Sequence, residues 1–188
     1  ARALGENTKF IQSIREFVMA GMPVYAECGG LVYLSDSIIV DGKRYPMAGI
    51  FPFVFELSKR PEAHGYTEFM VEADNPFYRN GTCVRGHEFR YSRLVNPGTV
   101  RDIATVFAMK RGTGIAAGRD GALFKNTLAT FSHTHALTAN ADWDRRLRLW
   151  RQHGMSVSDA TRHGSPRVVF EEYPEPGFNY RLTDIQAA

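Results

Sequence analysis

The feature that most constrains the fold is a short apolar run that ends on a cysteine and is followed at once by two glycines. Over residues 23–34 the chain reads Pro-Val-Tyr-Ala-Glu-Cys-Gly-Gly-Leu-Val-Tyr-Leu. A β-type run, small residues and then a helix-compatible stretch predict a nucleophile elbow, a sharp strand-to-helix turn that exposes a reactive side chain at the end of a sheet. Ala26 and Gly30, on either side of Cys28, let the backbone pass closely in such a turn.

Cys28 is the side chain that this turn would expose. A helix that starts after Cys28 directs free N–H groups and its positive dipole end toward the sulfur, and both favour the thiolate that attacks carbonyl carbon. The backbone N–H of Gly29 is placed to donate to an oxyanion, and losing one such donor typically costs about 3–4 kcal/mol of transition-state stabilisation. The alternative is that Cys28 is a small buried apolar residue, as many lone cysteines are.

Composition narrows the class of protein. The chain has 188 residues, of which 44% are apolar and 23% charged, and this balance is typical of a soluble globular domain. Its formal net charge of +3 is small and spread along the chain, so we expect no nucleic-acid partner. No apolar run reaches membrane-spanning length. The only cysteines, Cys28 and Cys83, suggest a reducing, cytoplasmic location without a disulfide.

Hydrophobic periodicity predicts a first helix followed mostly by β-structure. We expect an amphipathic helix from about Glu6 to Ala20, with one apolar face made by Phe10, Ile11, Ile14, Phe17 and Val18. Strands are predicted at 38–40, 44–48, 51–57, 66–72, 82–85, 88–94, 105–109, 122–124 and 128–132. Asp41-Gly42 and Asp120-Gly121 are predicted hairpin turns, and a short helix is expected over 142–152.

A cysteine nucleophile needs a histidine within hydrogen-bond reach, and residues 129–135 supply two. This segment reads Ala-Thr-Phe-Ser-His-Thr-His, so His133 and His135 follow an apolar strand and face one side if the strand persists. Either histidine could instead be structural. The His-x-His pair also suits zinc, but no third ligand at a suitable spacing is evident, so we expect no metal site.

Three segments together resemble the glutamine amidotransferase domain of the cobyrinic acid a,c-diamide synthase family. They are residues 23–31, residues 129–135, and the run Gly-His-Glu-Phe-Arg-Tyr-Ser at 86–92. The resemblance covers roughly residues 1–150 and leaves 151–188 as a C-terminal extension of unknown role. It implies a class I, flavodoxin-like α/β fold, in which a mostly parallel sheet is flanked by helices and carries an antiparallel β insertion.

The resemblance also implies roles for individual residues. Cys28 would attack the side-chain amide of L-glutamine, with His133, which follows the strand directly, as the base. Many related triads place a glutamate two residues after the histidine, where this chain has His135. His135 is therefore a possible third member, and a Cys–His dyad is the alternative. From a loop at 86–92, Glu88 would bind the ammonium of glutamine and Arg90 its carboxylate, unless this motif serves packing alone.

Cofactors and partners follow from the same resemblance. Ammonia would pass to a synthetase domain, in the same or a partner chain, that uses ATP and Mg²⁺ to amidate a corrinoid or a related tetrapyrrole. The chain contains no P-loop motif, so we expect no cofactor in this segment. The family's domain normally begins earlier, so its N-terminal part is expected to be missing here. A non-catalytic interaction module and a cysteine hydrolase on the same elbow are the two alternatives.

Overall fold

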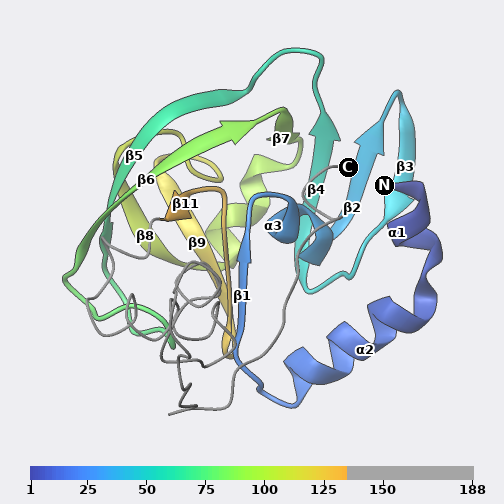
Figure 1. The fold of residues 1–188 in the computed structure, drawn as a ribbon, viewed down its shortest axis with the longest axis horizontal. Helices are drawn as coiled ribbons and strands as arrows, with labels where there is room; N and C mark the ends of the chain where they lie inside the picture. The colour runs from blue at the N-terminus through green and yellow to red at the C-terminus, as the bar shows by residue number, and fades with distance from the viewer. Residues whose placement is uncertain (135–188) are drawn as a thin grey trace, which may run out of the picture. The chain divides into compact units, whose positions relative to one another are not determined.

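Within the described part of the chain, the fold consists of two β-sheets and three α-helices (Figure 1). The computed structural model describes residues 1–134. The helix expected over 142–152 and the extension at 151–188 lie outside the described residues. The helices are α1 (Arg2–Glu6), α2 (Thr8–Met19) and α3 (Gly29–Leu34), and a 3-10 helix, η1, spans Pro97–Asp102.

The predicted first helix is confirmed, with a break near its start. Asn7 separates α1 from α2 and caps α2, since its side chain accepts a hydrogen bond from the Phe10 N–H at 3.1 Å. The buried face is narrower than predicted, because Ile11 and Val18 are buried whereas Phe10 and Phe17 are exposed. No helix within residues 1–134 combines the length and apolar composition needed to cross a membrane.

The larger sheet has seven strands in the order β1-β10-β9-β8-β5-β6-β11. Only β1 and β10 pair in parallel, and every other neighbouring pair is antiparallel. The strands are β1 (Val24–Glu27), β5 (Ala63–Val71), β6 (Cys83–Arg90), β8 (Ala104–Arg111), β9 (Arg119–Phe124), β10 (Thr127–Thr130) and β11 (His133–Thr134).

The smaller sheet has four strands in the order β3-β2-β4-β7. Here β2 and β4 pair in parallel, while β3 and β7 pair antiparallel to their neighbours. The strands are β2 (Ser35–Val40), β3 (Lys43–Pro46), β4 (Phe51–Leu57) and β7 (Ser92–Leu94).

The expectation of a mostly parallel sheet is wrong for residues 1–134. Short turns join β2 to β3 and β9 to β10, and such connections allow only antiparallel pairing, whereas parallel neighbours need a long crossover. Asp41-Gly42 forms the predicted hairpin turn between β2 and β3. Asp120-Gly121 does not form a turn, because both residues lie inside β9, where Gly121 has a φ of +67°.

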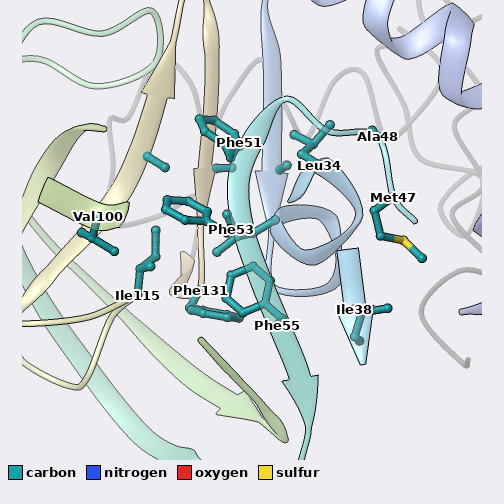
Figure 2. Packing of buried hydrophobic residues seen from close by; sticks show 14 residues of the cluster. Leu34, Ile38, Met47, Ala48, Phe51, Phe53, Phe55, Val100, Ile115 and Phe131 are labelled. Atoms are coloured by element: carbon teal, nitrogen blue, oxygen red, sulfur yellow. The ribbon is translucent and has the colours of Figure 1, made fainter. Parts of the chain in front are cut away.

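A row of phenylalanines on β4 fills the core between the sheets (Figure 2). Phe51, Phe53 and Phe55 alternate with outward residues along the strand, and all three are buried. The Phe55 ring lies 5.3 Å from the ring of Phe131, edge to face. Leu34 of α3 belongs to the same cluster. The helix after β1 and the end of β10 therefore both pack against the phenylalanines of β4.

Phe107 belongs to a second buried cluster, and two glycines with left-handed backbones allow its packing against β9 to be tested. Gly121 has a φ of +67°, and a Cβ there would meet the Phe107 ring at 2.6 Å. Gly42 has a φ of +75°, but a Cβ there would meet no atom within 4 Å. We expect Gly42→Ala to lower the free energy of unfolding by about 1 kcal/mol through backbone strain alone. Gly121→Ala should lower it by about 3 kcal/mol, because the ring must also move.

Urea unfolding of the two alanine variants measures this difference. Equal losses in the two variants would contradict the packing of Phe107 against the backbone of β9.

Candidate active site

The predicted strand-to-helix turn is present between β1 and α3. Cys28 occupies it with φ 49° and ψ −103°, a conformation that side-chain-bearing residues rarely adopt. Two hydrogen bonds hold the strained residue. The Cys28 N–H donates to the Thr130 carbonyl at 2.8 Å, and the Val32 N–H donates to the Cys28 carbonyl at 3.1 Å. Strain of this kind persists only where the surroundings determine it, and it is concentrated at functional sites.

The two glycines after Cys28 have different structural roles. A Cβ on Gly30 would lie 3.1 Å from the Ala26 Cβ, so the small residues permit the close turn that the sequence predicts. A Cβ on Gly29 would meet no atom within 4 Å, so space is open beside the residue that follows the cysteine. Cys28 is partly exposed, and neither it nor Cys83 is in a disulfide.

His133 reaches this turn from β11, the short strand that follows β10. It pairs across the sheet with His87 of β6, and the two imidazole rings stack with centroids 5.0 Å apart. The neighbouring Gly86 makes this approach possible, because a Cβ there would collide with the carbonyl of His133. Gly86 is therefore needed for close backbone packing at the site, independent of any contact with substrate.

The Cys28 thiol acts on the protonation of His133. Their hydrogen bond is the largest cause that raises the pKa of His133 from 6.5 to about 10, and a hydrogen bond with Glu27 is the next. Burial acts in the opposite direction. The imidazole is therefore protonated over the neutral range, so that the ring can give a proton to a leaving group.

Glu27 is a further member of the cluster that the sequence analysis did not identify. Its Oε2 lies 3.2 Å from His133 Nδ1. Its Oε1 accepts hydrogen bonds from the Tyr25 hydroxyl at 2.9 Å and from the Thr134 N–H and hydroxyl at 3.1 Å each. Burial alone would raise the pKa of Glu27, but the hydrogen bonds from His133, Thr134 and Tyr25 outweigh it and hold the pKa below its usual value.

One signal in the sequence could have pointed to Glu27. Alternation along β1 buries Ala26 in the core and turns Tyr25 and Glu27 to the other face together. A carboxylate at the end of an otherwise apolar strand, next to a candidate nucleophile, is an unusual placement. Only the three-dimensional structure shows that His133 and Thr134 contact this carboxylate.

Asp120 braces the segment that leads from β10 to His133. Its buried carboxylate accepts hydrogen bonds from the Thr130 hydroxyl at 2.7 Å and from the N–H groups of Phe131 and Ser132 at 3.1 Å each. Burial raises the pKa of Asp120, and these hydrogen bonds partly oppose that effect. The brace fixes the backbone immediately before His133.

The predicted loop at 86–92 is wrong, because β6 covers this segment as far as Arg90 and β7 begins at Ser92. Alternation along β6 buries the side chains of Glu88 and Arg90, which are 2% and 5% exposed, and turns Phe89 outward. The Phe89 carbonyl lies 4.0 Å from the Cys28 sulfur. The strand therefore borders the site, but the two charged side chains lie on its buried face.

Glu88 and Arg90 contact the protein's own backbone, each other and an aromatic ring. Arg90 Nε lies 3.9 Å from Glu88 Oε2, and the Arg90 guanidinium lies 4.0 Å from the centroid of the Phe131 ring. Glu88 Oε1 accepts hydrogen bonds from the N–H groups of Thr113 at 3.2 Å and Gly114 at 2.9 Å. Arg90 donates to the carbonyls of Ser92 and Gly114. These contacts favour the packing role that the sequence analysis left open. Direct contact of either side chain with glutamine stays a prediction.

The remaining predictions about the site concern His135 and metal ions. His135 lies outside the described residues, so its place as a third member stays a prediction. Within residues 1–134, no three or more His, Cys, Asp or Glu side chains are grouped so as to hold a metal ion.

Comparison with known proteins decides the family. The sequence profile of the CobB/CobQ-like glutamine amidotransferase domain matches residues 1–141. The chain belongs to this family. Resemblance to the amidotransferase domains of cobyrinate a,c-diamide synthases, expected from the three sequence segments, is thereby confirmed.

Several curated relatives of this amidotransferase domain are named cobyrinate a,c-diamide synthase. A cobyrinate a,c-diamide synthase from Methanosphaera stadtmanae is 42% identical over 135 residues, covering 71% of this chain and 28% of that protein. One from Caldanaerobacter subterraneus is 37% identical over 139 residues, covering 73% and 30%. One from Magnetococcus marinus is 33% identical over 152 residues, covering 80% and 32%. The chain thus spans less than a third of the length of these relatives.

The pairing of Cys28 with His133 can be tested by titrating the imidazole. In Cys28→Ala we expect the pKa of His133 to fall from about 10 by about one to three pH units, because its largest cause is removed. Nuclear magnetic resonance of the labelled imidazole measures the pKa directly. Cys83→Ala, at the other free cysteine, is the matched control and should leave the pKa in place. An unchanged value in the Cys28 variant would contradict the pairing.

Proposed function

We propose that this amidotransferase domain is a glutaminase, in which Cys28 is the nucleophile and His133 is the general acid and base. The observation that supports this best is the strained strand-to-helix turn at Cys28, where His133 is held 3.2 Å from Glu27, the residue before the cysteine. A partly exposed thiol, a histidine partner and open space beside Gly29 are what a cysteine nucleophile requires. Membership of the glutamine amidotransferase family makes glutamine the proposed substrate.

The proposed reaction begins when the Cys28 thiolate attacks the side-chain amide carbon of glutamine. The carbonyl π electrons move to the oxygen, where the N–H of Gly29 can stabilise the charge. As the carbonyl re-forms, the C–N bond breaks and His133 gives its proton to the leaving nitrogen. Ammonia departs, and a γ-glutamyl thioester remains on Cys28.

Water completes the proposed cycle. His133 takes a proton from water as the oxygen attacks the thioester carbon, and the C–S bond breaks to return the Cys28 thiolate and release glutamate. The His133 proton is restored in the same step. One glutamine and one water are consumed, and one glutamate and one ammonia are formed.

We further propose that the ammonia serves a synthetase domain in the same or a partner chain. Relatives that extend well beyond the matched region are named cobyrinate a,c-diamide synthases, which supports amidation of the a- and c-carboxylates of cobyrinate or of a related tetrapyrrole. ATP with Mg²⁺ would supply the activation of the acceptor carboxylate in that synthetase domain. The contribution of residues 1–134 is to release ammonia at Cys28.

Labelling with 6-diazo-5-oxo-norleucine, a reactive glutamine analogue, tests the nucleophile. We expect one covalent label on the wild-type protein and on Cys83→Ala, and none on Cys28→Ala, as measured by mass spectrometry. Cys83 is the matched control because it is the more exposed of the two free thiols. Absence of a label from the folded wild-type protein would favour a non-catalytic module instead.

Amidation by the full-length parent protein tests the role of the ammonia. In Cys28→Ala, amidation supported by glutamine should fall by about a thousandfold or more, because the covalent intermediate cannot form. Amidation supported by added ammonium chloride should remain within about threefold of the wild-type rate. Equal loss of both activities would count against a dedicated ammonia-releasing site. Cleavage of peptide or ester probes without a preference for glutamine would instead favour a cysteine hydrolase.

A further inference from the structure

We propose that Glu27 is the positioning residue of this site, holding His133 through Nδ1 so that Nε2 faces Cys28. The inference rests on the proposed glutaminase activity and assigns the role of third member to a residue that precedes the nucleophile in the chain. It replaces the expectation that the position two residues after His133 supplies this group.

The carboxylate of Glu27 is oriented by its own contacts. Oε1 accepts three hydrogen bonds, one from Tyr25 and two from Thr134, at 2.9–3.1 Å. This leaves Oε2 directed at His133 Nδ1, 3.2 Å away. A carboxylate fixed at one oxygen can orient an imidazole with the other, because neither group has to be ordered again when the reaction begins.

A partly buried group of hydroxyls supports this orientation. The Tyr25 and Tyr78 hydroxyls lie 2.7 Å apart, and each lies within 3.2 Å of the Thr134 hydroxyl. Burial raises the pKa of both tyrosines, so they remain neutral donors over the working range of pH. Glu27 is therefore the acceptor at the end of a hydrogen-bond network that is anchored on β1, β11 and the loop before β6.

Among residues 1–134, the titratable groups that face His133 include Cys28 from the turn after β1, His87 from β6 and Glu27 from β1. Glu27 is the only carboxylate among these three. After Cys28, it is the next largest cause of the raised pKa of His133, which agrees with a negative charge held beside Nδ1.

The chemical role follows from which nitrogen carries the proton. An ionised Glu27 favours a proton on Nδ1, so that Nε2 is the nitrogen that exchanges a proton with Cys28 and with the leaving amine. The same charge stabilises the imidazolium that forms when the thiolate forms. Glu27 acts through His133 and does not itself touch glutamine in this proposal.

Glu27→Gln is the sharpest variant. The three donors around Oε1 require an oxygen there, so the new amide nitrogen must face Nδ1. That nitrogen donates a hydrogen bond, which forces the proton of a neutral imidazole onto Nε2, the wrong tautomer for accepting a proton from Cys28. We expect kcat for glutamine hydrolysis to fall by about a hundredfold or more, with KM within about threefold.

Two further measurements separate positioning from a structural role. The alkaline limb of the kcat profile should move to lower pH in Glu27→Gln, because His133 loses its proton more easily without the charge. Glu27→Asp keeps the charge and should recover at least about tenfold of the lost rate. The matched control is Glu56→Gln, which removes a carboxylate that is paired with Arg93 on β7. It should leave both kcat and the pH profile unchanged.

Titration of His133 by nuclear magnetic resonance keeps the two proposals distinguishable. If Glu27→Gln leaves kcat within threefold and the pKa of His133 unchanged, the positioning role is wrong while the glutaminase proposal stands. If the wild-type protein hydrolyses no glutamine, the glutaminase proposal fails. A lower pKa of His133 in folded Glu27→Gln would still support the contact that the positioning role requires.

Discussion

The parallel pairing of β1 with β10 is the interaction on which the candidate site depends. The register sets Glu27 opposite Thr130, and the Cys28 N–H extends the ladder by donating to the Thr130 carbonyl. The two strands end at the same edge of the sheet, so the turn after β1 and the segment after β10 leave it together. This pairing brings Cys28 near His133, although about a hundred residues separate them in the chain.

Two buried interactions, one apolar and one polar, hold that edge of the sheet in place. Phe131 packs against the β4 phenylalanines, and Asp120 accepts hydrogen bonds from the backbone on either side of this ring. Hydrogen bonds to a charged group contribute about 1.5–3 kcal/mol each, so the turn before His133 is strongly determined. A strained Cys28 and a short β11 can persist because the apolar core and the carboxylate brace leave the backbone little freedom.

Local signals predicted the elements of the site better than their arrangement. The apolar run, the small residues and Cys28 indicated the strand-to-helix turn, and α2 followed from helical periodicity. The strands predicted at 82–85 and 88–94 leave Gly86 between them. In the structure β6 continues through it, because the missing side chain admits the backbone of β11. Asp120-Gly121 was wrongly predicted to be a hairpin turn. Gly121 does have a left-handed backbone, but it lies inside β9, where the absence of a side chain leaves room for the Phe107 ring.

What the sequence by itself determined is the chemistry that is local along the chain: a turn that only small neighbours permit around Cys28, and the strand from which His133 follows. These short segments also indicate the family to which the chain belongs. Only the tertiary structure decided which side chains contact one another and which are buried. The burial of Glu88 and Arg90 and the contact of Glu27 with His133 both depend on strand register. Register is set by long-range packing, because one residue of slip would turn each of these side chains to the opposite face.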